Sequence, residues 1–523
     1  MPKRKHLVAL LVMVASLVAP RSARADLLDT VRSRGTLIWG ADQEGGGPYV
    51  YPRDDAPEIV TGFEVELADL IARELGVKAR FFQGNWDKLP DLARTGQIDV
   101  VLNGYERTPE REAVLEATKP YYVYGLQLLV KRGSAFTDLD ALAEKATARV
   151  GVLGGSAAES LVTERLGAKA VVSYDGNTDA MREVETGKLD ATIQDTPIVA
   201  FYSPRFPALV PAGKPMAEGH YVLYVKKGER RLAETIDRAL VALLASGELE
   251  RLYTRYGLWN PQQEQLFSLL GVARTRPAPA PSASASPEPP QPMVSEPIRA
   301  AERPRGLAVL SAYGGTLLGA AGITILLSVV SFPIAVAVGL LVALGRLYGP
   351  RWLARPLVAY VEILRGTPLM LQLYFLFFFL PELGVTLPAY ATAIIGLSVN
   401  YSAYESEIYR AGLQAVPPGQ MEAALALGMS RLQALRHVVV PQATRTVIPP
   451  VVNDFIALFK DTSVCSVVTV VELTKRYSIL NMSTQATVEL TLATGLLYLA
   501  MSLPLGILSR RLEARLGLKA ITA

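Results

Sequence analysis

The first half of the chain alternates short β-rich runs with amphipathic helical patterns. TLIWGAD (36–42) and IDVVLNG (98–104) have the apolar character of buried strands, whereas FEVELADLIARELG (63–76) repeats apolar residues at helical spacing. Strands that alternate with helices in this way are typical of an α/β domain with a mainly parallel sheet. Because residues 26–265 are many for a single core, we expect two lobes.

The second half contains long apolar runs instead. From residue 306 onward the pattern predicts about five membrane helices, each near the roughly 20 residues that a bilayer requires. The predicted spans are 319–344, 357–380, 390–409, 448–471 and 488–509. Residues 266–305, between the halves, are rich in Pro, Ala and Ser, which is typical of a linker. The sequence therefore predicts an α/β domain at 26–265 and an all-α transmembrane domain at 306–523.

Composition supports a membrane protein and argues against several kinds of site. Hydrophobic residues make up 50% of the chain and charged residues 20%, which is more apolar than a purely soluble protein. The net charge of +4 comes without a long basic run, so we expect no nucleic-acid partner. Cys465 is the single cysteine, and three scattered histidines give no metal-binding spacing. We therefore expect no metal site, no disulfide and no catalytic residue.

The first residues predict export from the cytoplasm. MPKRKH is basic, residues 7–19 are apolar, and ARA at 23–25 fits a cleavage signal. Residues 1–25 are therefore expected to be a signal peptide, with a short uncleaved anchor as the alternative. Either reading places the following α/β domain outside.

The charges of the loops give the same orientation. With the α/β domain outside, the loop after the first span faces the cytoplasm, and it carries Arg346, Arg351 and Arg355 as the positive-inside rule requires. Two further crossings place residues 417–440 in the cytoplasm. We expect a multi-pass protein of the inner (plasma) membrane, in contact with its lipid, with its N-terminal domain in the periplasm or outside.

Three local patterns in the exported domain suit a small zwitterion. Thr108 and Pro109 predict a helix start that holds Arg111 in its first turn, where a guanidinium can grip a carboxylate. Ser156 begins another helix, whose free N–H groups favour an anion. Asp195 follows a strand and is able to accept an ammonium group. Taken singly, each has a simpler reading as a surface arginine, an ordinary helix cap or a turn.

Taken together, these patterns resemble a known family. GFEVELADLIARELG, VVLNGYERTPER, RVGVLGGSAAESL and LDATIQDTP, in this order, resemble the polar amino-acid periplasmic binding proteins over nearly all of residues 35–260. The resemblance implies the two-lobed type II fold, with the ligand bound between the lobes. It implies that Arg111 binds the ligand α-carboxylate and Asp195 its α-ammonium. The further implied ligand-binding residues are Asp42, Tyr49, Trp86, Gly104, Tyr105, Glu106, Gly155, Ser156 and Ala157.

Two of these positions depart from the family pattern. Glu106 stands where the family has Ser or Thr, and Ala157 replaces a common Thr. A buried carboxylate needs a cation or a proton, so Glu106 favours a polar or cationic amino acid as ligand. The alternative is that Glu106 turns away and pairs with Arg107 or Arg111.

Residues 416–441, VPPGQMEAALALGMSRLQALRHVVVP, form a half-polar segment between two predicted spans. Pro418 is expected to begin one short helix that stops at Gly428. Ser430 and Gln433 form a capping box for a second helix, which we expect to end at Pro441. Periodicity alone also allows an amphipathic helix on the membrane surface. The spacing resembles the ATPase-coupling loop of ABC importer permeases, which implies coupling roles for Glu422, Ala423, Ala424, Gly428 and Pro441.

These features predict a receptor and a permease of an ABC amino-acid importer in one chain. No G-x-x-x-x-G-K-[ST] phosphate loop occurs, so the chain is expected to bind no cofactor, and ATP is expected on a separate ATPase subunit. A domain of five spans is half of a permease pair, which predicts a homodimer. Polar groups within the spans, among them Asn400, Asp454 and Asp461, either line a path or pair together. The alternatives are an amino-acid-gated channel and a membrane-bound sensor.

Overall fold

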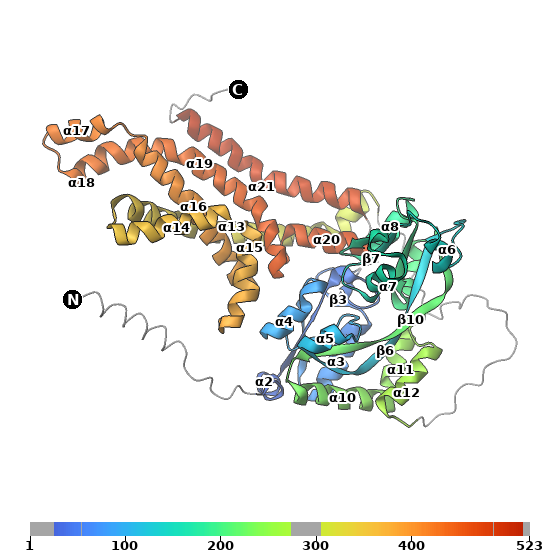
Figure 1. Ribbon diagram of the computed structural model, residues 1–523. Coiled ribbons are helices and arrows are strands. Elements are labelled where there is room, and N and C mark those ends of the chain that lie inside the picture. Colours follow the sequence, from blue (N-terminus) through green and yellow to red (C-terminus); the bar gives the residue numbers. More distant parts are fainter. Residues whose placement is uncertain (1–25, 54, 274–304, 485, 516–523) are drawn as a thin grey trace.

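The computed structural model describes residues 26–515 except 54, 274–304 and 485. The predicted signal peptide and most of the predicted linker lie outside the described residues. The chain forms an α/β domain and a helical domain that lie side by side (Figure 1).

A mixed sheet of eight strands runs through the whole α/β domain, in the order β4-β1-β5-β10-β6-β9-β7-β8. Its strands are β1 (Thr36–Ala41), β4 (Lys78–Gln83), β5 (Val100–Val101), β6 (Leu115–Lys131), β7 (Val150–Leu153), β8 (Val171–Tyr174), β9 (Ala191–Asp195) and β10 (Leu209–Lys226). A separate pair consists of β2 (Tyr51–Pro52) and β3 (Val60–Thr61).

The strand pairing divides this domain into two lobes. In the first lobe β1 pairs in parallel with β4 and β5, and in the second β7 pairs in parallel with β8 and β9. The antiparallel strands β6 and β10, of 17 and 18 residues, continue from one lobe into the other. The two-lobed prediction is therefore confirmed, and the lobes share two long crossover strands.

Helices cover both faces of the sheet because their apolar stripes match its buried faces. They are α2 (Leu27–Arg34), α3 (Phe63–Leu75), α4 (Leu89–Thr95), α5 (Pro109–Val114), α6 (Leu139–Ala143), α7 (Ala157–Leu166), α8 (Asn177–Glu185), α9 (Thr196–Tyr202), α10 (Arg230–Ala245), α11 (Glu248–Arg255) and α12 (Gln265–Leu270). As predicted, Thr108 caps α5 and Ser156 caps α7, each accepting a backbone N–H three residues on.

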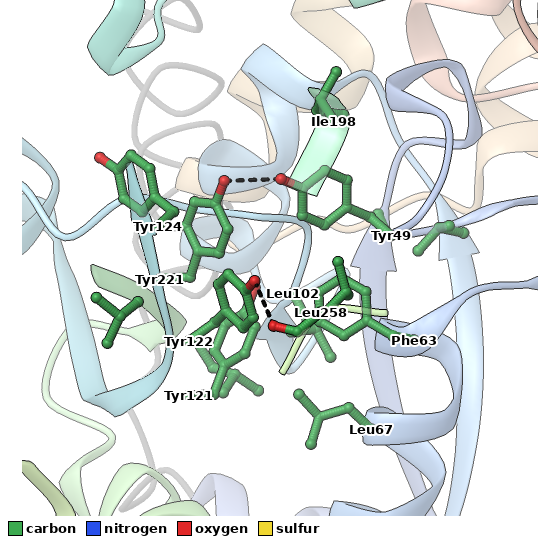
Figure 2. Packing of buried hydrophobic residues seen from close by; sticks show 14 of the residues in the cluster. Tyr49, Phe63, Leu67, Leu102, Tyr121, Tyr122, Tyr124, Ile198, Tyr221 and Leu258 are labelled. Atoms are coloured by element: carbon green, nitrogen blue, oxygen red, sulfur yellow. Dashed lines mark hydrogen bonds between the residues drawn. The ribbon is translucent and has the colours of Figure 1, made fainter. Parts of the chain in front are cut away.

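Aromatic side chains form the core where the crossover strands meet the first lobe. Figure 2 shows Tyr122 and Tyr124 of β6 beside Tyr221 of β10, with Phe63 of α3 below Tyr49. The rings of Tyr124 and Tyr221 stack with centroids 4.4 Å apart, and these side chains are almost fully buried. Closely packed, stacked rings resist rearrangement. This core therefore holds β10 in place and keeps the Tyr221 side chain directed toward the cleft.

The helical domain comprises nine described helices. They are α13 (Leu307–Tyr348), α14 (Arg351–Gly366), α15 (Leu369–Tyr374), α16 (Ala389–Gln414), α17 (Pro418–Ala426), α18 (Arg431–Ala434), α19 (Val440–Asp461), α20 (Leu473–Thr484) and α21 (Thr487–Arg515). Among the described residues, Leu307–Tyr348 and Thr487–Arg511 are long and apolar enough to cross a membrane. They contain the predicted spans 319–344 and 488–509.

Two of the other three predicted spans need correction. Residues 357–380 do not form one straight helix, because the helical segments Arg351–Gly366 and Leu369–Leu383 are bent by 110° relative to each other. Pro368 explains this break, since proline lacks an N–H and disfavours helical geometry in the residue before it. The spans 390–409 and 448–471 fall on α16 and α19, whose composition is more polar than that of α13. The predicted end at 471 is wrong, since α19 ends at Asp461 and a 3₁₀ turn follows.

The predicted helix pair at 417–440 is present, with one difference. Gly428 follows α17 with φ = 83°, a left-handed conformation that favours glycine, and Ser430 and Gln433 form a capping box on α18. Pro441 does not end the second helix. A π-helical turn at Leu435–Val439 continues from α18 into α19, and Pro441 lies in the first turn of α19, directly after this π-helical turn.

The α/β domain contacts the helical domain along α20. Lys475 donates to Glu44 Oε2 (2.7 Å) and to Asn85 Oδ1 (2.8 Å), both in the first lobe. On the second lobe, Arg205 donates to the carbonyl oxygen of Ser483 (3.3 Å). A single helix therefore touches both lobes. The helices α17 and α18 lie at the opposite end of the helical domain, far from the lobes (Figure 1).

Candidate functional site

A small cavity lies between the two lobes. Its volume is about 30 Å³, far below the roughly 300 Å³ of an ordinary small-molecule site, so the lobes are closed over it. Of the predicted ligand-binding residues, six line it, namely Tyr49, Trp86, Gly104, Glu106, Ser156 and Asp195. Tyr105, Arg111, Gly155 and Ala157 contact these lining residues from behind, as described next.

One wall of the cavity is an aromatic stack that supports Arg111. The rings of Trp86 and Tyr105 are stacked with centroids 4.7 Å apart, and the guanidinium of Arg111 lies 5.2 Å and 4.8 Å from their ring centres. A cation over aromatic faces is stabilised by their quadrupoles. The stack therefore holds the Arg111 side chain in one place although its helix, α5, has only six residues.

Glu106 does not turn away from the cavity. Its carboxylate accepts a hydrogen bond from Arg111 Nη1 (2.5 Å) and a second one from the backbone N–H of Ala157 (3.0 Å), at the start of α7. The Arg111 Nη2 atom also donates to the carbonyl oxygen of Gly155 (3.0 Å). The alternative pairing with Arg107 does not occur, since Arg107 pairs with Glu112. Glu106 is only 3% exposed, and its carboxylate joins the two lobes.

Asp195 faces the cavity from the second lobe. Its carboxylate accepts a hydrogen bond from the hydroxyl of Tyr221, whose oxygen lies 2.8 Å from that of Tyr49, as Figure 2 shows for the two tyrosines. Burial, helped by the nearby negative charge of Glu106, raises the pKa of Asp195 to about 8, although the Tyr221 hydrogen bond and the charge of Arg111 oppose the rise. Among the described residues, the Tyr221 hydroxyl is the side-chain donor to the Asp195 carboxylate, and no cationic side chain donates to it.

Asp42 does not line the cavity, contrary to the expectation that it faces the ligand. Its carboxylate accepts hydrogen bonds from the backbone N–H groups of Glu44 (3.0 Å) and Trp86 (2.9 Å) and from the amide of Gln83 (2.8 Å). All three donors belong to the first lobe. Asp42 therefore positions Trp86, and its carboxylate lies next to the segment that Lys475 contacts.

Sequence reasoning missed several lining residues. They are Gly45, Asn103, Leu153, Ala158, Asn177, Ile193, Gln194 and Ile198. Gln194 and Asn103 precede predicted site residues directly, so adjacency was an available signal. Asn177 gave no signal, because it reaches the cavity only through the closure of the lobes, where its amide donates to the carbonyl oxygen of Gly45 (3.3 Å).

A second cavity, of about 600 Å³, lies in the helical domain. Asn400, Asp454 and Asp461 line it together with Arg365. The hydroxyl of Tyr401 donates to Asp461 (2.6 Å), and Asn400 donates to Gln372 (3.1 Å). Glu407, another charged residue of α16, does not line this cavity; its carboxylate accepts hydrogen bonds from Arg410 and from Arg346 (2.8 Å).

Comparison with known proteins identifies both domains. Residues 38–258 match the bacterial extracellular solute-binding proteins of family 3, and residues 335–518 match the inner membrane component of binding-protein-dependent transport systems. A probable amino-acid ABC transporter permease of Sinorhizobium fredii is 38% identical over 191 residues, which are 36% of this chain and 82% of that protein. The chain belongs to the amino-acid ABC permease family. It is a fusion of a solute-binding domain with such a permease.

Two further relatives match the permease domain of this amino-acid importer. The L-cystine transport system permease of Bacillus subtilis is 40% identical over 168 residues, 32% of this chain and 72% of the relative. The glutamine transport system permease of Escherichia coli is 33% identical over 203 residues, 38% of this chain and 92% of the relative. The two alternatives, a gated channel and a sensor, find no support in these matches.

Solved structures match the solute-binding domain of the importer. An ancestral amino acid-binding protein, described as a precursor of cyclohexadienyl dehydratase, is 29% identical, with a TM-score of 0.41, over 44% of this chain and 99% of that one. A mutant arginine-binding protein of Thermotoga maritima has the same identity and TM-score, over 44% of this chain and 98% of its own.

The raised pKa of Asp195 predicts how the stability of the ligand-free importer depends on pH. Unfolding returns this pKa from about 8 to an ordinary 3.8, so the protonated group favours the folded state, and that contribution is lost as pH rises toward 8. Asp195→Asn keeps a neutral hydrogen-bonding group at every pH. The melting temperature of the variant should therefore rise relative to wild type from pH 5 to pH 8 and stay level above. Calorimetry of the full chain in detergent measures this, and a constant difference across pH contradicts the assignment.

Proposed function

We propose that this importer captures a polar or cationic amino acid in the periplasm and passes it through its own permease domain. Arg111 binds the ligand α-carboxylate together with the backbone N–H of Ala157, which follows Gly155 and Ser156 at the start of α7, and Asp195 accepts the α-ammonium. The observation that carries this proposal is the closed cleft, in which Arg111 and the start of α7 already hold a carboxylate between the lobes. The glutamine and L-cystine names of the permease relatives support a polar amino acid.

Energy for transport comes, in this proposal, from a separate ATPase subunit that binds ATP and contacts the helices α17 and α18. Glu422, Ala423 and Gly428 are exposed there, and so are two large apolar side chains, Leu427 (81% exposed) and Leu432 (74%). Exposed apolar groups at the end of a domain are typical of a protein contact. The chain itself is then no enzyme, binds no cofactor and works as a homodimer in the inner membrane.

Receptor docking uses α20 in this proposal. The helix contacts Glu44 and Asn85 of the first lobe through Lys475, and Arg205 of the second lobe through Ser483. In this proposal, α20 can contact both lobes at the same time only when the cleft between them is closed. The cavity lined by Asn400, Asp454 and Asp461 then lies on the transport path. Because receptor and permease share a chain, docking is intramolecular and needs no free receptor.

Removing Arg111 tests the ligand assignment. Arg111→Ala should weaken amino-acid binding by about 100-fold or more, because a charge-assisted bidentate contact with the carboxylate is lost. Titration calorimetry of the full chain in detergent, with the amino acid that gives the largest thermal shift in a screen, measures the affinity. Arg107→Ala is the matched control, since Arg107 pairs with Glu112 outside the cavity. Equal affinities of wild type and Arg111→Ala overturn the assignment.

Substitution in α17 tests the coupling assignment. Glu422→Ala, and separately Gly428→Ala, should lower ligand-stimulated ATP hydrolysis of the reconstituted complex several-fold and leave ligand binding unchanged. Alanine at 428 meets no neighbouring atom but is strained by its positive φ, by about 1 kcal/mol. Leu383→Ala, an exposed position outside α17 and α18, is the control. Unchanged stimulation in both variants contradicts the role.

A charge exchange tests the docking contact. Lys475→Glu should reduce transport into proteoliposomes, because it faces the Glu44 carboxylate, and Glu44→Lys in the same chain should restore part of it. Ligand affinity should stay within about twofold, since neither Lys475 nor Glu44 lines the cavity between the lobes. Full transport by Lys475→Glu alone argues against docking through α20.

A further inference from the structure

Glu106 makes the contacts that the proposed function assigns to the ligand carboxylate. One oxygen accepts from Arg111 Nη1 (2.5 Å) and the other from the backbone N–H of Ala157 (3.0 Å). The side chain of Glu106 is 3% exposed and that of Arg111 16%. A carboxylate of the chain itself therefore occupies the anion site and accepts hydrogen bonds from both lobes.

Further hydrogen bonds join the two lobes beside this contact. Arg111 also reaches the carbonyl oxygen of Gly155 (3.0 Å), and the backbone N–H of Gly47 in the first lobe donates to the hydroxyl of Tyr202 in the second (3.1 Å). The remaining cavity, about 30 Å³, has space for water but not for an amino acid. The hydrogen bonds that join the lobes here are made by groups of the chain itself.

An amino acid cannot simply join this arrangement. Its α-carboxylate would bring a second negative group beside Glu106, and among the described residues at this cavity Arg111 is the only cation that pairs with Glu106. Two carboxylates on one buried guanidinium repel each other, and the one left over loses its hydrogen bonds. The ligand must therefore displace Glu106 from both Arg111 and Ala157.

We propose that Glu106 is an internal competitor of the ligand carboxylate, which occupies its position in the empty receptor and lowers the affinity for amino acids. This inference rests on the proposed function, because it requires Arg111 to bind the ligand carboxylate. Affinity is reduced by the fraction of receptors in which Glu106 has released Arg111. The residue at position 106 thereby sets the amino-acid concentration at which the importer loads.

Glu106 is assigned to competition and not to recognition of a cationic ligand group because both of its oxygens are engaged. Its backbone carbonyl is engaged too, by Arg111 Nη1 (3.0 Å) and by the hydroxyl of Tyr224 (3.1 Å). Asp195, by contrast, receives only a tyrosine hydroxyl and lies across the cavity. It is the carboxylate free to meet an ammonium.

The test replaces Glu106 with a side chain too short to bridge the lobes. Glu106→Thr should bind the amino acid selected by the thermal-shift screen at least about tenfold more tightly than wild type, in calorimetry of the full chain in detergent. Glu106→Gln, which keeps the shape without the charge, should show a smaller gain. Glu112→Thr removes a neighbouring carboxylate that pairs with Arg107 outside the cavity, and it should leave the affinity unchanged.

A second measurement follows the closure itself. Fluorescent labels on Lys78→Cys and Lys169→Cys, exposed positions in different lobes, report the distance between the lobes by energy transfer, while the buried Cys465 stays unlabelled. Without ligand, Glu106→Thr should shift the lobes from mostly closed to mostly open. Equal or weaker binding by Glu106→Thr, or an open wild-type receptor, overturns the inference and leaves the amino-acid receptor standing. Absence of amino-acid binding by wild type and variants alike contradicts the proposed function and this inference with it.

Discussion

A guanidinium that is held inside a closed cleft needs an anion, and this need organises the solute-binding domain. Arg111 stays charged at any physiological pH, so burial is tolerable only when a carboxylate pairs with it. Trp86 and Tyr105 fix its position, Asp42 fixes Trp86, and the start of α7 supplies an N–H to the same anion. The lobes come together around this charge, whether the carboxylate belongs to Glu106 or to a ligand.

On the opposite wall of the cleft, a buried carboxyl group is stabilised in its neutral form instead of being paired with an opposite charge. Asp195 has no cation, and its pKa is raised because burial favours the neutral form. The Tyr221 hydroxyl that contacts it belongs to an aromatic core shared by the crossover strands (Figure 2). Within the described sheet, those strands are the part common to both lobes. The aromatic core that supports Asp195 therefore also packs against the strands on which the relative position of the lobes depends.

The helical domain has two distinct ends. The α20 end meets both lobes of the receptor, and the α17–α18 end lies far from them (Figure 1). Packed helices connect the two ends, so a change at one face can reach the other through them.

Local patterns in the sequence determined much of this protein. The α/β alternation, the caps at Thr108 and Ser156, the stop at Gly428 and the capping box at Ser430 depend on neighbours within four residues, and each is present as expected. Residue order and spacing also identified the two domains. The bend at Pro368 follows from the geometry of proline itself, and the helix continues through Pro441 after a π-helical turn; hydrophobicity alone reveals neither.

The tertiary structure alone decided what the site residues do. Asp42 turned to the first lobe because backbone N–H groups of Glu44 and Trp86 meet there, and Asn177 entered the cavity from a helix that the sequence did not connect with it. Above all, the sequence left Glu106 with two alternatives. Only the closed lobes bring Ala157, 51 residues away, within hydrogen-bonding distance of its carboxylate, because that contact depends on how two separate lobes meet.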